Sequence, residues 1–117
     1  MEILCKIRDI QRAVYQFELN FENQYGICLN EGMALCTLFS TKELSSGELG
    51  KLLGLSASNT SKVIRSIESK GLVERVIGSE DKRQMYFFIS PKGCALLSEI
   101  KSAEIQLPLL IRQLTDK

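Results

Sequence analysis

The chain has 117 residues, 44% of them hydrophobic, and its 15 basic and 14 acidic side chains leave a formal net charge of +1. This length and composition predict a single domain with one hydrophobic core. No apolar run approaches the ~20 residues of a membrane-spanning helix, and the first residues lack the apolar stretch of a signal peptide. We therefore expect a cytoplasmic protein with no membrane association.

The first predicted element is a long amphipathic helix within residues 1–28 that ends near Gly26. Its apolar side chains recur in steps of four and three residues, a heptad seam suited to packing against another helix. That other helix can belong to the same chain or to a second copy, and both interpretations stay open. The seam consists of Ile3, Ile7, Ile10, Val14, Phe17 and Phe21.

Residues 44–93 carry the signals of two capped helices joined by a short turn. Ser45 and Glu48 form a capping box at the start of the first helix, and Gly54 is suited to end it in a left-handed conformation. Ser56 is the predicted N-cap of the second helix, so only three residues separate the two. The apolar stripes are Leu49, Leu52 and Leu53 in the first helix, and Thr60, Val63, Ile64 and Ile67 in the second, which Gly71 and Leu72 close.

The opposite face of the second helix is polar, and Glu68 is its first acid. Short hydroxyl and amide side chains near the helix start can approach base edges, while Lys62 and Arg65 can neutralise phosphates or contact guanine. The same polarity would suit an ordinary solvated surface. The predicted DNA-contacting residues of this segment are Ser56, Ser58, Asn59, Ser61, Lys62 and Arg65.

Two strands rich in β-branched and aromatic residues, 73–77 and 85–89, flank a polar loop and predict a hairpin with a charged tip. In this tip Lys82 and Arg83 suit a phosphate backbone, and Asp81 can accept hydrogen bonds that stiffen the loop. An ordinary soluble loop is the alternative.

The charge distribution favours DNA over a merely solvated face. Residues 56–92 carry seven basic and four acidic side chains, a net of +3, whereas the rest of the chain carries eight basic and ten acidic ones, a net of −2. The basic third therefore coincides with the segment that would meet a phosphate backbone.

Ser90 and Pro91 are predicted to begin a further helix, as its N-cap and first residue. Apolar residues continue this helix toward the C-terminus. We expect the apolar surfaces of the terminal helices, residues 1–28 and 91–117, to pair with a second copy and form a homodimer. Residues 29–90 would then be the DNA-binding lobe of a single domain.

Three stretches resemble the MarR family of bacterial transcription regulators: LGLSASNTSKVIRSIESKGLVER, the pattern Asp81-Lys82-Arg83, and the step Ser90-Pro91-Lys92-Gly93. The resemblance implies a mainly α fold with a small β-wing, which is a winged helix-turn-helix with N- and C-terminal dimerisation helices. It places the polar face described above on the recognition helix and implies that Arg83 enters a minor groove.

The resemblance also implies a function. A MarR-like dimer would bind a pseudo-palindromic operator in double-stranded DNA, with an affinity modulated by a small-molecule effector. The effector cleft would be lined by Phe17, Phe21 and Tyr25, which are also suited to a core. The segment after Pro108 is shorter than the C-terminal helices of typical members. A winged-helix adaptor that binds protein instead of DNA is the alternative function.

The four cysteines match no zinc-binding pattern, and the chain has no histidine. We predict no metal and no cofactor. Cys36 and Cys94 are predicted to be small core residues, whereas Cys5 and Cys28 are candidates for a thiol-based redox switch near where some MarR-like regulators hold an oxidant-sensing thiol. Without histidine, a nucleophile elbow or a phosphate-binding glycine loop, no enzymatic activity is predicted.

Overall fold

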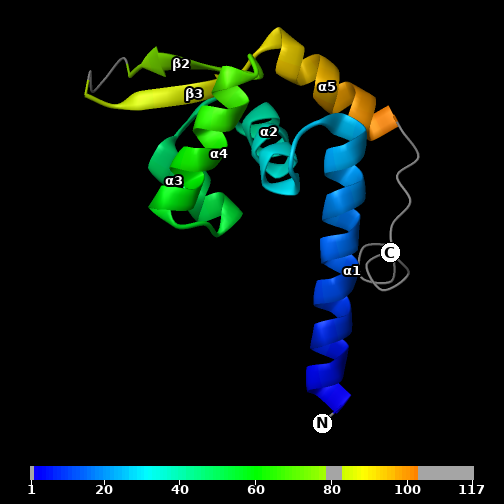
Figure 1. The fold of residues 1–117 in the computed structure, drawn as a ribbon. Coiled ribbons are helices and arrows are strands. Elements are labelled where there is room, and N and C mark those ends of the chain that lie inside the picture. Colours follow the sequence, from blue (N-terminus) through cyan, green and yellow to red (C-terminus); the bar gives the residue numbers. More distant parts are fainter. Residues whose placement is uncertain (1, 79–82, 103–117) are drawn as a thin grey trace. The chain divides into compact units, whose positions relative to one another are not determined.

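The computed structural model describes residues 2–78 and 83–102 (Figure 1). They belong to two compact units, one containing the chain up to Leu29 and the other residues 30–102. The second unit holds the predicted helix-turn-helix and hairpin. No helix in the described part of the chain is long and apolar enough to cross a membrane.

Helix α1 (Glu2–Tyr25) makes up most of the first unit. It ends as predicted at Gly26, whose φ of 74° is left-handed and whose N–H donates to the Glu22 carbonyl at 2.8 Å. The predicted seam is exposed near the start of the helix, where Ile3 is 65% exposed, and buried near its end, where Phe21 is 6% exposed. The first turns of α1 therefore present apolar side chains to solvent.

Helix α2 (Leu29–Thr41) precedes the two helices of the motif, α3 (Ser46–Leu53) and α4 (Ala57–Ser69). The predicted capping box is confirmed: the Ser45 hydroxyl accepts from Glu48 N at 3.2 Å, and the Glu48 carboxylate accepts from Ser45 N at 3.0 Å. These bonds hold the pKa of Glu48 below its usual range. Gly54 ends α3 with a φ of 71°.

The predicted caps of α4 are also confirmed. The Ser56 hydroxyl accepts from Asn59 N at 3.1 Å. At the other end Gly71 has a φ of 74° and donates to the Glu68 carbonyl at 3.0 Å, while Leu72 N donates to the Ile67 carbonyl at 2.9 Å. This pair of bonds is a Schellman motif, which fixes the last turn of the helix.

Helices α3 and α4 approach closely at Gly50, where an added Cβ would lie 2.7 Å from Thr60 Oγ1. The packed face of α3 therefore runs through Leu49 and Gly50. The prediction that Leu52 belongs to this apolar stripe was wrong, because Leu52 is 61% exposed and the buried residues of α3 are Leu49 and Gly50. A glycine in the contact face gives no apolar signal in the sequence.

Three antiparallel strands form a sheet in the order β1-β3-β2. Strands β2 (Val73–Ile77) and β3 (Met85–Ile89) have the predicted bounds and project from the helices as a wing (Figure 1). The sequence did not predict β1 (Leu44–Ser45), because two residues carry no alternation and are defined only by their pairing with β3.

Helix α5 (Pro91–Ser102) begins as predicted, with the Ser90 hydroxyl accepting from Gly93 N at 3.0 Å. The same hydroxyl donates to the Gly71 carbonyl at 2.6 Å and so joins the start of α5 to the end of α4. Leu97 and Ile100 are buried. The predicted apolar residues from Ala103 onward lie outside the described residues.

The prediction that Cys36 is a core residue was wrong, because its side chain is exposed. Helix α2 buries Ala34, Leu35 and Leu38, and Cys36 lies on the opposite face with Phe39. The apolar run containing Cys36 is therefore amphipathic rather than buried throughout. Cys94, the other predicted core thiol, is half-buried.

Candidate nucleic-acid interface

The two faces of α4 separate as predicted. Thr60, Val63, Ile64 and Ile67 are buried, with Ile67 0% exposed. All six residues predicted to contact DNA along this segment are exposed: Ser56, Ser58, Asn59, Ser61, Lys62 and Arg65. A rigid helix thus presents hydroxyl, amide and basic groups together on one solvent-facing surface.

Two of these six side chains already have partners within the helix. The Ser56 hydroxyl is occupied as the N-cap, accepting from Asn59 N. The Arg65 Nε lies 3.5 Å from the Ser61 carbonyl, at the weak limit of a hydrogen bond. The guanidinium of Arg65 can therefore turn toward a ligand at little cost.

The tip of the wing is described only in part. The base of its loop is closed by a hydrogen bond from Gly78 N to the Gln84 carbonyl at 2.8 Å, and Arg83 is exposed. Asp81 and Lys82 lie outside the described residues. Their predicted roles, in stiffening the tip and contacting phosphate, remain predictions.

Arg75 is a residue of this surface to which the sequence assigned no role. Its Nε and Nη2 each donate at 2.6 Å to the carboxylate of Glu68, and its guanidinium lies over the ring of Phe87, 5.6 Å from the centroid. The hydrogen bond to Arg75 holds the pKa of Glu68 below its usual range, and Glu68 raises that of Arg75. The only acid of α4 is therefore neutralised by a cation from β2.

A signal for this position was present in the sequence. Side chains two apart in a strand share a face of the sheet, and Arg75 follows the buried Val73 by two residues. Arg75 also lies opposite Phe87 in the antiparallel register. The alternation of side chains along β2 therefore places Arg75 on the face of the sheet that packs against the helices. The net charge of the segment does not contain this information.

An open cavity of about 400 Å³ lies beside the polar face of α4. The residues that line it come from α3, α4 and both long strands of the sheet. They are Ser46, Ser61, Ile64, Arg65, Arg75 and Phe87. The cavity thus brings two guanidinium-bearing residues to one groove.

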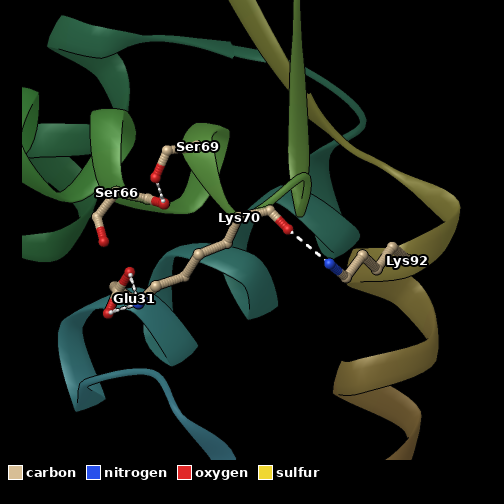
Figure 2. Close-up of polar contacts among 5 residues, drawn as sticks. All are labelled: Glu31, Ser66, Ser69, Lys70 and Lys92. Atoms are coloured by element: carbon tan, nitrogen blue, oxygen red, sulfur yellow. Dashed lines mark hydrogen bonds and ion pairs between the residues drawn. The ribbon is translucent and has the colours of Figure 1, made fainter.

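The C-terminal end of α4 is fastened by contacts from two other helices (Figure 2). Lys70 Nζ donates to both carboxylate oxygens of the buried Glu31 in α2, at 3.1 and 3.2 Å. Lys92 Nζ of α5 donates to the Lys70 carbonyl at 2.9 Å. These ties orient the helix whose polar face forms the candidate interface.

Cys5, Cys36 and Cys94 are free thiols. Cys5 is exposed and Cys28 is half-buried, and the redox role considered for them remains a prediction. Over residues 2–78 and 83–102, no group of three or more cysteine, aspartate or glutamate side chains could hold a metal ion.

Comparison with known proteins identifies the family. The model of the MarR family matches residues 27–85, half of the chain. The chain belongs to the MarR family. Among curated proteins, this MarR-family chain is 28% identical over 99 residues to YsmB of Bacillus subtilis, an uncharacterised HTH-type transcriptional regulator, covering 85% of the chain and 68% of YsmB.

Solved structures confirm the predicted winged helix-turn-helix fold of this MarR-family protein. The regulator BldR of Sulfolobus solfataricus superposes with a TM-score of 0.79 at 23% identity, over 99% of this chain and 82% of BldR. MepR of S. aureus, solved in complex with DNA, superposes with a TM-score of 0.67 at 22% identity, over 82% of this chain and 79% of MepR. The family comprises transcriptional regulators and not enzymes.

Proposed function

We propose that this MarR-family protein binds double-stranded DNA in a sequence-specific manner and regulates transcription in the cytoplasm. The observation that carries the proposal is the exposed polar face of α4, which presents Lys62 and Arg65. The first acidic residue of this helix is Glu68, and its carboxylate is paired with Arg75. A helix of this kind, supported by a second helix across a short turn, fits a major groove.

The wing supports the same proposal. Arg83 is exposed at its described end, and a hairpin beside a recognition helix can follow the phosphate backbone into the adjacent minor groove. MepR, which shares the fold, has been solved with DNA bound. An Arg83 contact to a narrow, A·T-rich groove would add specificity through DNA shape.

We further propose a homodimer on a pseudo-palindromic operator. The start of α1 exposes Ile3, Leu4 and Ile7, and pairing of these side chains with a second copy would remove them from water. Two recognition helices about one helical turn of DNA apart would then read two half-sites. The terminal segments 1–28 and 91–117 are the proposed source of the interface.

A small-molecule effector is part of the proposal. The rings of Phe17, Phe21 and Tyr25 lie in succession on α1, with centroids 5.9 and 5.0 Å apart. The Tyr25 hydroxyl is buried and has no hydrogen-bond partner among the described residues. A buried hydroxyl without a hydrogen bond lowers the stability of a protein. A polar group of a bound aromatic ligand would provide the missing hydrogen bond.

Selection of bound duplexes from a random pool by the purified protein tests this function. We expect enrichment of a sequence with two inverted half-sites. Affinity should fall steeply with salt, and Lys62→Ala, Arg65→Ala and Arg83→Ala should each weaken binding and reduce the salt dependence. Lys51→Ala removes one positive charge from an exposed lysine of α3, outside the predicted contacts and the proposed dimer segments, and serves as the control.

The alternative function, a winged-helix adaptor for another protein, makes the opposite prediction. An adaptor would retain no duplex even at low salt. Equal affinities of the three variants and the control would also reject the proposed interface, because a nonspecific electrostatic effect depends on net charge and not on its position.

A further inference from the structure

The groove beside α4 combines basic residues from two different elements. Arg65 belongs to the recognition helix and Arg75 to the wing strand β2, and both line the cavity of about 400 Å³ with Ser46 and Ser61. None of the described residues that line this cavity is acidic. Its chemistry is that of a site for an anion with several oxygen acceptors.

Glu68 accepts hydrogen bonds from only some of the N–H groups of Arg75, so the others can bind a ligand. The guanidinium carries five N–H donors, and Glu68 engages those of Nε and Nη2. Within the described part of the chain, no hydrogen bond joins Nη1 to another group. The side chain remains 49% exposed.

The contacts of Arg75 also limit its motion. Glu68 is hydrogen-bonded to one edge of the planar guanidinium, and the Phe87 ring packs against its face. A group already fixed in this way loses less conformational entropy when it binds a ligand. Arg75 is therefore preorganised, whereas the single weak bond from Arg65 leaves that side chain adjustable.

We propose that this groove is the binding site for one backbone phosphate of the bound duplex, with Arg75 of the wing strand as its fixed ligand and Arg65 as its adjustable one. The inference rests on the proposed DNA-binding function, since the ligand is part of the DNA. It assigns to β2 a direct contact with the duplex, in addition to those of the recognition helix and wing tip.

Arg75→Ala in the full-length protein tests the site. With the duplex obtained by selection, we expect about tenfold weaker binding, as for loss of a charged hydrogen bond, and a salt slope smaller by about one per protomer. Lys51→Ala, at an exposed lysine of α3 outside the predicted contacts, is the control for loss of one charge elsewhere, and its slope should equal that of the wild type. An Arg75→Ala protein with unchanged affinity would overturn the proposal.

Duplexes in which a single phosphate is replaced by an uncharged methylphosphonate locate the contact. For the wild type, replacement at one position in each half-site should weaken binding through loss of the Arg75 contact. For Arg75→Ala, replacement at that position should cost less affinity than it does in the wild type, because only Arg65 still contacts this phosphate, while the other positions keep their wild-type sensitivity. If Arg75→Ala lowers affinity but leaves every position as sensitive as it is in the wild type, Arg75 only supports the fold and the proposal is wrong.

The Glu68→Gln variant tests whether Arg75 binds phosphate or only forms a structural ion pair, because it leaves the guanidinium in place. Glutamine keeps an acceptor for Arg75 and removes a negative charge from the groove, so a phosphate site predicts binding at least as tight as that of the wild type. A purely structural ion pair predicts weaker binding in proportion to lost stability. Weaker binding by a Glu68→Gln protein that unfolds at the wild-type temperature would count against the phosphate site.

These outcomes are distinguishable from failure of the proposed function. If the wild type binds no duplex, both proposals fall together. If the wild type selects and binds a duplex while Arg75 variants match it at every phosphate, DNA binding stands and the phosphate site alone is rejected.

Discussion

The Lys70 ammonium group lies 3.1 Å from Oε2 and 3.2 Å from Oε1 of Glu31, a side chain only 5% exposed. Lys70 is the C-cap of α4, and Glu31 lies in the first turn of α2. A buried carboxylate facing a cation is costly to leave without that cation. The pair therefore ties the end of the recognition helix to α2.

We expect Lys70→Met to lower the free energy of unfolding by about 1–2 kcal/mol, less than for a fully buried pair because Lys70 is partly exposed. Chemical denaturation at fixed protein concentration measures the change. Lys51→Met, an exposed lysine of α3, should change it by less than about 0.5 kcal/mol. If Lys70→Met costs as much in a Glu31→Gln background as in the wild type, the pair does not stabilise the fold.

Gly50→Ala should destabilise the helix-turn-helix by about 1–3 kcal/mol through overpacking. The new Cβ would lie 2.7 Å from Thr60 Oγ1, and that hydroxyl is held by its bond to the Ser56 carbonyl at 2.8 Å. Gly47→Ala is the matched control in the same helix, because its Cβ meets nothing within 4 Å. The unfolding temperatures of both variants are measured and compared. Equal stability of Gly50→Ala and Gly47→Ala would show that the close approach of α3 to α4 at Gly50 has no energetic consequence.

Ser56→Ala and Ser58→Ala should separate a capping role from a contact role. Ser56→Ala removes the acceptor for Asn59 N and should cost about 1 kcal/mol of stability. Ser58 is exposed in the first turn of α4, so its replacement should leave stability within about 0.5 kcal/mol of the wild type. Denaturation and duplex binding are measured for both, and a large stability loss in Ser58→Ala would contradict the assignment.

The Glu68–Arg75 pair predicts a pH dependence of stability. Because the pKa of Glu68 is lowered in the folded protein by its hydrogen bond to Arg75, the contribution of this carboxylate is complete above the ordinary glutamate pKa. It is lost as the pH falls through the lowered value, when the folded protein must also take up the proton. The difference in stability between wild type and Glu68→Gln should therefore shrink as the pH falls below that of ordinary glutamate titration. A difference independent of pH over this range would rule out the linkage.

Local signals were sufficient for much of the motif. The capping box at Ser45, the left-handed Gly54, the N-cap at Ser56 and the Schellman end at Gly71 each involve residues within a few positions of one another. Such short-range hydrogen bonds are set by residue type and spacing, so the bounds of α3 and α4 follow from the sequence. The bounds of the wing strands follow instead from their β-branched and aromatic residues. The exposed face of α4 follows from the bounds of this helix, because helical periodicity fixes which side chains point outward.

Only the tertiary structure decided which distant residues meet. The bond from Lys70 to Glu31 spans 39 positions, the two-residue strand β1 exists only through β3, and Leu52 and Cys36 are exposed because packing against neighbours selects one face of each short helix. The placement of Arg75 beside the recognition helix depends likewise on sheet register and on Glu68. Periodicity determines how one element is oriented about its own axis, whereas contacts between elements depend on how the chain closes on itself.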